Sequence, residues 1–278
     1  MDSFFNEENS AEIVNARMQA DLHPRLAQIM ASLVKHLHEF AKEVELTQEE
    51  WNKAIEFLTA TGKICSQERQ EFILLSDILG FSMLVDAISN RRPQGATENT
   101  VLGPFFVEDA PIHAIGDSIC LDGKGESCTY EGKVTGFEGD PIDRVCIDVW
   151  SDNDEGFYDV QQPDLQPKWN NRGRFITGPD GLYRFVGIKP VSYPIPDDGP
   201  VGKLLSALGR HPYRPAHMHF KLSAPGYKDI ITHIFDGDDA HIGDDAVFGV
   251  KKTLIAPFES YDKETKWRSI FNFVMVKA

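Results

Sequence analysis

Up to about residue 95, apolar residues recur at the three- and four-residue spacing of amphipathic helices. The first stripe consists of Leu26, Ile29, Met30, Leu33, Val34 and Leu37. It predicts a helix with one broad apolar face. A second helix is expected to begin after Thr47, because Glu50 follows it at the spacing of a capping box. We expect this helix to end near Gly62.

A third helix is expected to begin near Ser66 and to continue to the segment 91–95. Its apolar positions are Phe72, Leu75, Ile78, Leu79 and Met83. The segment 91–95 contains two arginines, a proline and a glycine. Proline and glycine interrupt helices, so the helical region should end there.

After Thr100 the apolar period shortens to that of strands. The strand-like runs are residues 119–121, 130–134, 145–150, 182–186, 217–222 and 230–235. Glycine- and proline-rich turn signals separate them at 139–141, 178–181 and 224–226. Many short strands with such turns favour a β-sandwich over a parallel sheet. The predicted fold class is α+β, with a helical domain over residues 1–100 and a mainly-β sandwich domain over residues 101–278.

Composition and charge narrow the classes of partner. The formal net charge is −15 over 278 residues, which disfavours nucleic acid and anionic membranes as partners. No apolar run approaches the ~20 residues that a membrane-spanning helix needs, so membrane insertion is not expected. The first nine residues carry three acids and no basic region, unlike a secretory signal. Four scattered cysteines without a Cys-x-x-Cys pair fit a cytoplasmic protein.

The strongest chemical signal is the sequence His217-Met218-His219 within a strand-like run. Side chains alternate along a strand, so both histidines should point to one face and the apolar residues to the other. Adjacent neutral imidazoles are natural ligands for iron, zinc, copper or nickel. Taken alone, the pattern also fits two surface or hydrogen-bonded histidines, and both interpretations stay open.

Further ligands are harder to identify from the residues. Two tyrosines in loop segments, Tyr158 and Tyr193, stand out because no cysteine lies near the histidine pair. A phenol has a pKa of about 10, so it is a poor ligand until a strongly charged cation displaces its proton. A trivalent ion could do so. A lone tyrosine in a loop is more commonly a packing residue, so composition does not select these two.

Three motifs occur in order along the chain: Thr97-Glu-Asn-Thr-Val-Leu-Gly103-Pro-Phe-Phe106, Arg214-Pro-Ala-His217-Met-His219 and Ser223-Ala-Pro-Gly226-Tyr227. Together they resemble the catechol 1,2-dioxygenase family of intradiol dioxygenases, and the resemblance covers nearly the whole chain. It implies one Fe(III) per chain, held by Tyr158, Tyr193, His217 and His219. It also implies two catalytic residues: Arg214, as the active-site arginine, and Tyr193, which is expected to leave the metal when substrate binds.

Within that family, two details resemble the members that cleave hydroxyquinol. One is the segment 244–251, and the other is His233, where catechol-cleaving members usually carry glutamine. The substrate pocket that this resemblance implies consists of Leu74, Asp77, Val101, Leu102, Gly103, Pro104, Phe105, Ile195, Pro196, Arg214 and His233. Leu102 departs from the phenylalanine expected at its position. Leu74 and Asp77 are three residues apart and should share a helix face that covers the histidines.

The implied reaction is cleavage of hydroxyquinol (benzene-1,2,4-triol) by dioxygen. The product would be 3-hydroxy-cis,cis-muconate, which tautomerises to maleylacetate, in the catabolism of aromatic compounds. Cleavage of catechol to cis,cis-muconate is the alternative within the family. The resemblance also implies a homodimer joined through the helical domain, with a phospholipid bound between its helices.

Two interpretations from other classes remain at this point. One is a transthyretin-like β-sandwich that binds a small ligand without catalysis, which would not need two tyrosines and an arginine around the histidine pair. The other is a zinc hydrolase, although zinc favours histidine, cysteine and carboxylate ligands and no suitable carboxylate accompanies the pair. Visible colour would distinguish both from an iron enzyme.

Overall fold

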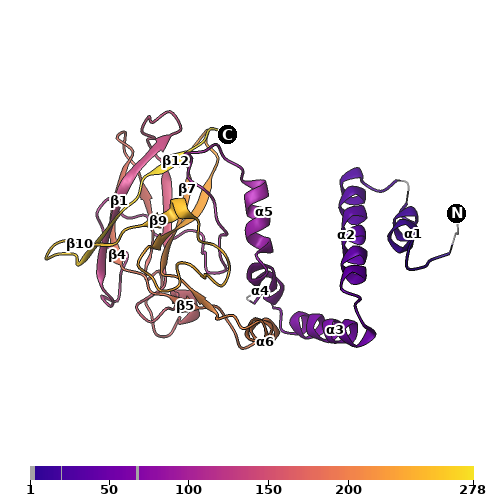
Figure 1. The fold of residues 1–278 in the computed structure, drawn as a ribbon. Coiled ribbons are helices and arrows are strands. Elements are labelled where there is room, and N and C mark those ends of the chain that lie inside the picture. The colour runs from indigo at the N-terminus through magenta and orange to yellow at the C-terminus, as the bar shows by residue number, and fades with distance from the viewer. Residues whose placement is uncertain (1–3, 20, 67–68) are drawn as a thin grey trace. The chain divides into compact units, whose positions relative to one another are not determined.

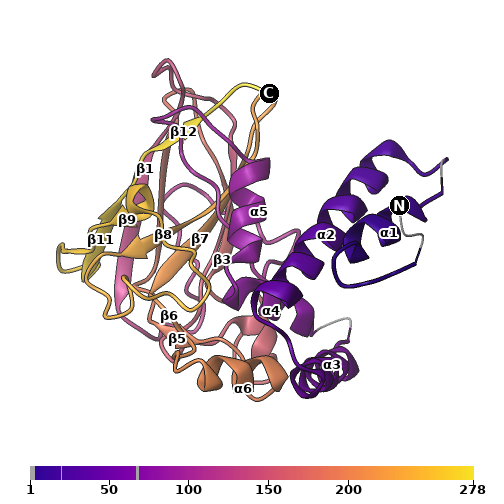
Figure 2. The same ribbon diagram turned by 45° about the vertical axis from the view of Figure 1, so that its right-hand side comes forward.

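The structure is a computed structural model that describes residues 4–19, 21–66 and 69–278. The chain divides at Lys63 into two compact units. Figures 1 and 2 show the elements of each unit in two views. The expected start of the third helix, near Ser66, falls partly on residues 67–68, which lie outside the described residues.

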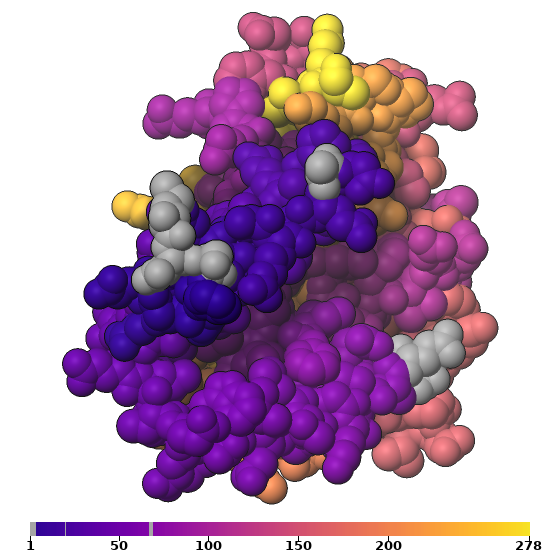
Figure 3. Space-filling model, turned by 90° about the vertical axis from the view of Figure 1, so that its right-hand side faces the viewer, coloured from indigo at the N-terminus to yellow at the C-terminus, as the bar shows by residue number. Residues whose placement is uncertain are grey.

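The first unit contains three helices: α1 (Ser10–Ala16), α2 (Pro24–Glu43) and α3 (Gln48–Lys63). The predicted capping box is present, because Glu50 accepts from the amide of Thr47 at 2.9 Å and its own amide donates to the Thr47 hydroxyl at 3.3 Å. Figure 3 shows α2 and α3 in indigo. Many of their apolar side chains are about half exposed in the single chain: Leu26, Ile29, Leu33, Leu37, Phe40, Trp51, Ile55 and Leu58.

The expected third helix is two helices, α4 (Glu71–Ile78) and α5 (Phe81–Ser89), which meet at 82°. The break falls at Gly80, whose φ of 71° lies in the left-handed region that glycine adopts without strain. The prediction of one continuous helix was therefore wrong. Within the described residues, no single helix has the length and hydropathy of a membrane span, although the bent pair α4–α5 meets that test when the two are joined.

The second unit is built on two five-stranded sheets. The first sheet contains β10 (Glu259–Ser260), β11 (Trp267–Ile270), β1 (Ser127–Gly136), β12 (Phe273–Met275) and β4 (Leu182–Ile188). The second has the order β3 (Arg172–Ile176), β2 (Cys146–Trp150), β7 (His217–Ser223), β8 (Ile230–Asp236) and β9 (Ile255–Ala256). A short hairpin of β5 (Tyr193–Pro194) and β6 (Tyr213–Arg214), and the helix α6 (Pro200–Ala207), lie outside these sheets.

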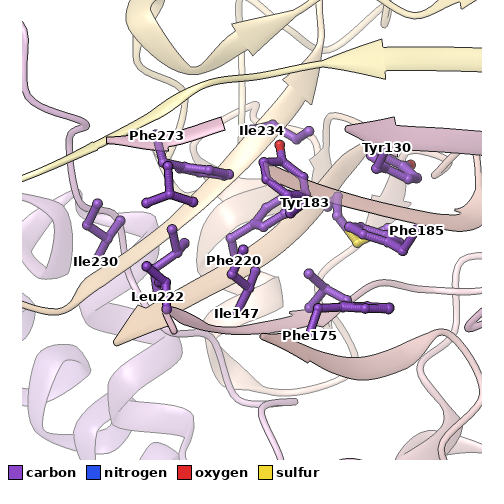
Figure 4. Packing of buried hydrophobic residues seen from close by; sticks show 14 of the residues in the cluster. Tyr130, Ile147, Phe175, Tyr183, Phe185, Phe220, Leu222, Ile230, Ile234 and Phe273 are labelled. Carbon is purple, nitrogen blue, oxygen red and sulfur yellow. The ribbon is translucent and has the colours of Figure 1, made fainter. Parts of the chain in front are cut away.

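The inner faces of the two sheets enclose an aromatic core (Figure 4). Phe185 of β4 stacks on Tyr130 of β1 at 4.9 Å and on Phe175 of β3 at 5.0 Å. From β7, the three apolar residues that alternate with the histidines enter this core: Met218, Phe220 and Leu222. The α+β class with a mainly-β sandwich is therefore confirmed.

One expected strand is absent. Residues 119–121 form no strand, although Ile119 is fully buried. Its amide donates to the Val186 carbonyl at 2.8 Å, and its carbonyl accepts from the Asn171 amide. The backbone of Ile119 is therefore hydrogen-bonded to two different segments and forms no continuous strand ladder with either. Burial of one apolar side chain produced the strand-like pattern.

Candidate metal centre

β7 lies in the middle of its sheet, between β2 and β8, and carries the histidine pair. His217 and His219 are 1% and 2% exposed, on the face opposite to the sandwich core. His219 lies opposite Trp150 of β2, and the two rings stack at 4.6 Å. The alternation of the strand therefore fixes both imidazoles side by side, as the spacing predicted.

Each tyrosine is held by its own loop. Tyr158 precedes a 3-10 turn (η1, Asp159–Gln161), and its amide donates to the Gln161 side chain at 2.9 Å. Tyr193 opens the β5–β6 hairpin, where it pairs with Arg214. The two loops touch at Gly156, because a Cβ there would lie 2.9 Å from the Cβ of Tyr193. Glycine at this position thus allows the approach of the two tyrosines.

The four side chains converge on one point. The Nε2 atoms of His217 and His219 are 3.2 Å apart, and His219 Nε2 lies 3.0 Å from the Tyr158 hydroxyl. The two tyrosine hydroxyls are 3.3 Å apart. Donor atoms that each lie about 2.0–2.2 Å from a shared metal have separations of this size. These residues could therefore hold one ion between them.

The protonation of the histidines suits metal binding. His217 Nδ1 donates to the Pro215 carbonyl at 2.7 Å, which leaves the lone pair of Nε2 directed at the cluster. Burial, with the positive charge of Arg214, lowers the pKa of His217 to about 3. Burial and the neighbouring histidines also lower the pKa of His219 well below its usual value. Both rings are therefore neutral at physiological pH, which is the form in which an imidazole can bind a metal.

The tyrosines need a cation to ionise. Burial raises the pKa of Tyr158 well above its usual value, and the neighbouring Tyr193 raises it further. Burial also raises the pKa of Tyr193, although the charge of Arg214 opposes that rise. Two buried phenols would become anionic only beside a strongly charged ion. Two neutral imidazoles with two potential phenolates match a hard trivalent ion such as Fe(III) better than zinc.

Arg214 lies beside this cluster and is 4% exposed. Its Nη1 atom is 3.2 Å from His217 Nε2. Burial by itself would lower the pKa of the guanidinium, but the carboxylate of Asp245 and the two tyrosines raise it. Arg214 therefore places a permanent positive charge next to the potential ligands, and a second buried arginine, Arg172, lies over the Tyr158 ring at 5.9 Å.

The expected pocket residues are only partly brought together by described contacts. Leu102 and Phe105 pack on the cluster of Tyr158, Tyr193 and Trp150, and the Phe105 ring stacks on Tyr158 at 4.6 Å. A Cβ on Gly103 would lie 3.2 Å from the His219 ring. Ile195 is buried next to the hairpin. Leu74 and Val101 are partly buried, and Pro104 and Pro196 are exposed.

Asp77 and His233 belong to different elements, α4 and β8. The charges of Arg214 and Asp245 both act on Asp77, although burial is the main cause of its raised pKa. His233 is fully buried on β8, opposite His219, with the two rings 4.1 Å apart. Its Nδ1 shares a hydrogen bond with the hydroxyl of Thr100. His233 thus lies against both histidines, and substrate contact for it stays a prediction.

Sequence reasoning missed several residues of the site. Trp150 forms its floor by stacking on His219, and Phe106 packs on Trp150 at 4.9 Å. Asp245 pairs with Arg214 from 31 residues further along the chain. The indole of Trp150 ends a strand-like run, so alternation could have placed it on the histidine face. Asp245 lies in the segment 244–251 noted for its resemblance, but no local signal in the sequence predicts its pairing with Arg214.

Comparison with known proteins gives consistent matches over most of the chain. Residues 101–276 match the family described as "Dioxygenase", and residues 23–97 match "Catechol dioxygenase N terminus". The hydroxyquinol 1,2-dioxygenase of a Rhizobium species is 59% identical over 93% of this chain and 88% of that protein. The catechol 1,2-dioxygenase of Candida albicans is 40% identical over 92% of this chain and 85% of that protein.

A solved structure is similar in fold and sequence. The hydroxyquinol 1,2-dioxygenase of Pseudomonas putida superposes with a TM-score of 0.93 at 44% identity. The match covers 98% of this chain and 99% of that one. Both the helical part and the sandwich are therefore shared with these relatives.

Proposed function

Because this chain belongs to the family of intradiol ring-cleavage dioxygenases, we propose that it cleaves hydroxyquinol with dioxygen at one ferric iron per chain. The proposed ligands are Tyr158, Tyr193, His217 and His219. The observation that carries this proposal is the convergence of two phenols and two neutral imidazoles within 3.3 Å of a neighbour. A non-catalytic carrier or a zinc hydrolase would not need that set of donors.

The substrate is proposed from the relatives. Hydroxyquinol-cleaving relatives reach 59% identity, against 40% for the catechol-cleaving relative described above. Cleavage between the two adjacent hydroxyl-bearing carbons gives 3-hydroxy-cis,cis-muconate, which tautomerises to maleylacetate. The enzyme would then act in the catabolism of aromatic compounds. Catechol stays the alternative substrate.

The residues around the proposed metal have different roles in the reaction. When bound, ferric iron supplies Lewis-acid chemistry that lowers the pKa of the diol hydroxyls and activates the ring toward dioxygen. Tyr193 would be one of the residues that hold the metal, and its phenolate oxygen would accept one substrate proton when the diol binds. Arg214 stabilises the negative charge that develops on the substrate. Phe105 and Leu102 form an apolar wall that helps exclude water.

Iron content and colour test the proposed centre. We expect about one iron per chain and a visible tyrosinate-to-iron absorption band, because phenolates bind the ferric ion directly. Tyr158→Phe and Tyr193→Phe should each shift or remove the band. Tyr261→Phe is the matched control, since Tyr261 is a 40% exposed surface tyrosine. A colourless active protein with stoichiometric zinc would refute the iron proposal.

We further propose that residues 1–100 form a dimerisation domain and residues 101–278 the catalytic domain. Support comes from the half-exposed apolar faces of α2 and α3, which a single chain leaves in contact with water. A hollow in the first unit, lined in part by Phe5, Leu37, Phe40, Leu46 and Trp51, suits a phospholipid acyl chain. A cytoplasmic location is proposed from the sequence alone.

The assembly proposal predicts a dimer of the 31.2 kDa chain in light scattering at micromolar concentration. Leu33→Glu should give monomers because it places a charge on the apolar face of α2, where Leu33 is 53% exposed. Lys35→Glu, on an exposed polar position of the same helix, is the control and should stay dimeric. Mass spectrometry of the denatured protein should detect the phospholipid. A wild-type monomer with its helices intact would exclude the dimer.

A further inference from the structure

The orientation of Arg214 requires an explanation, because a long flexible side chain is fixed in a buried place. The residue lies on β6, three residues before His217, and is 4% exposed. A buried guanidinium without a partner is costly and would also repel a metal ion beside it. We therefore expect a neighbouring residue both to neutralise the charge of Arg214 and to fix the orientation of its side chain.

Asp245 meets Arg214 from the opposite side to the metal centre. Arg214 Nε lies 3.2 Å from Asp245 Oδ1 and Nη2 lies 3.4 Å from Oδ2. Asp245 is 5% exposed and also accepts from the amides of Val247, at 3.2 Å, and Gly249, at 2.8 Å. The carboxylate is thus tied to its own loop by two backbone donors, and it presents both oxygens to the arginine in the paired geometry that suits a guanidinium.

Opposite charges strengthen the pairing of Asp245 with Arg214. Burial by itself would raise the pKa of Asp245, but the charge of Arg214 and their hydrogen bonds hold it below its usual value. Asp245 is therefore ionised at neutral pH. The Nη1 group, which Asp245 does not engage, is the one that lies 3.2 Å from His217 Nε2.

The backbone of the same loop closes on the guanidinium. A Cβ on Gly249 would lie 2.8 Å from Arg214 Nη2 and 3.0 Å from Asp245 Oδ2. Any side chain at this position would push the arginine or the carboxylate away. The glycine therefore permits a contact that limits rotation of the guanidinium group.

The loop also braces the helix that carries Asp77. Arg210 donates to the Ala246 carbonyl at 2.8 Å and to the carbonyl of Ile78, at the end of α4. Phe248 lies against the bend between α4 and α5, since a Cβ on Gly80 would be 3.3 Å from its ring. One loop thus contacts both the catalytic arginine and the end of the helix that forms part of the expected pocket.

We propose that Asp245 is a positioning residue that fixes Arg214 with Nη1 directed at the candidate metal centre, where it lies 3.2 Å from His217 Nε2, and that Gly249 is required for this arrangement. The inference rests on the proposed function, because it assigns a role within ring cleavage. Asp245 touches neither substrate nor metal ligands in this account. It acts only through Arg214.

The test compares Asp245→Asn with Asp244→Asn in the iron-loaded enzyme. Asp244 is the matched control, since this neighbouring carboxylate points outward to His211 and His241 and its side chain is 58% exposed. We expect Asp245→Asn to lower kcat by about 10- to 100-fold, as removal of supporting residues commonly does, with a smaller change in KM. The iron content and the visible band should stay unchanged. Gly249→Ala, which removes no charge, should give the same split.

A double-mutant cycle gives the sharper result. In the Arg214→Ala background, Asp245→Asn should change kcat less than about twofold, because it has no arginine left to position. The proposal would be overturned if Asp245→Asn lowered kcat equally with and without Arg214. It would also be overturned if Asp245→Asn and Gly249→Ala both had the kcat of Asp244→Asn, or if both variants lost iron. A wild-type enzyme that binds iron but cleaves no diol would instead reject the proposed function.

Discussion

Replacing His217 by alanine is expected to lower iron retention and ring cleavage by more than about 100-fold, since loss of a direct ligand exceeds the usual cost of losing a supporting residue. The imidazole is poised as a neutral ligand by the Pro215 carbonyl and by burial, which lowers its pKa to about 3. Met218, the next residue on β7, cannot take its place, because it points into the sandwich core.

Metal analysis and oxygen uptake should be measured on the same preparations. His36→Ala is the control, because the His36 side chain is 71% exposed on α2. The unfolding temperature of the variant should be compared with that of the iron-free wild type, which separates loss of metal from loss of fold. Full activity with stoichiometric iron in His217→Ala would reject His217 as a ligand.

Replacing Asp77 by alanine is expected to lower kcat/KM for hydroxyquinol about 10- to 100-fold more than for catechol. The third hydroxyl of hydroxyquinol needs a polar partner in a closed pocket, and a charged hydrogen bond contributes about 1.5–3 kcal/mol. Asp77 is partly buried on α4, close enough to Arg214 for the guanidinium charge to lower its pKa, although burial raises that pKa overall. This placement suits a carboxylate that faces the pocket.

Asp77→Asn separates charge from shape, because the amide keeps the size of the carboxyl group. It should retain part of the preference, since a neutral hydrogen bond is weaker than a charged one. Steady-state kinetics on both substrates provide the measurement. Equal losses on hydroxyquinol and catechol would give Asp77 a structural role instead.

Local patterns predicted the elements whose burial alternates regularly. The run 217–222 alternates between core and metal face, so both its strand and the direction of its histidines followed from period two. The capping box at Thr47 and Glu50 likewise located the start of α3. In each case the deciding interaction lies within a few residues along the chain.

The parts that sequence patterns did not predict depend on contacts between distant segments. β3 begins with Arg172, a charged residue that can be buried because it pairs with Asp159 at 2.6 Å. The polar residues of β3 therefore did not show the apolar pattern of a strand. The short strands β9 to β12 have two to four residues each, too few to show a period. The bend at Gly80 was not predicted, because an isolated glycine also occurs within continuous helices.

In the candidate site, too, local patterns predicted some residues, whereas others depend on contacts between distant segments. Alternation placed the histidines, whereas Tyr158 and Tyr193 were selected only by resemblance, because a loop tyrosine carries no periodic signal. The contact of their loops at Gly156 is a tertiary feature. Asp245 lies in the segment 244–251 that the resemblance singled out, but its role was not predicted because its partner, Arg214, lies 31 residues away.

The central claim is intradiol cleavage of hydroxyquinol, and steady-state kinetics on hydroxyquinol and catechol side by side test it most directly. Oxygen uptake should be followed together with identification of the ring-opened product. The account predicts one dioxygen consumed per hydroxyquinol, maleylacetate as the product after tautomerisation, and a kcat/KM at least about tenfold higher than for catechol. A kcat/KM for catechol equal to or above that for hydroxyquinol, or a product cleaved outside the two adjacent hydroxyls, would contradict it.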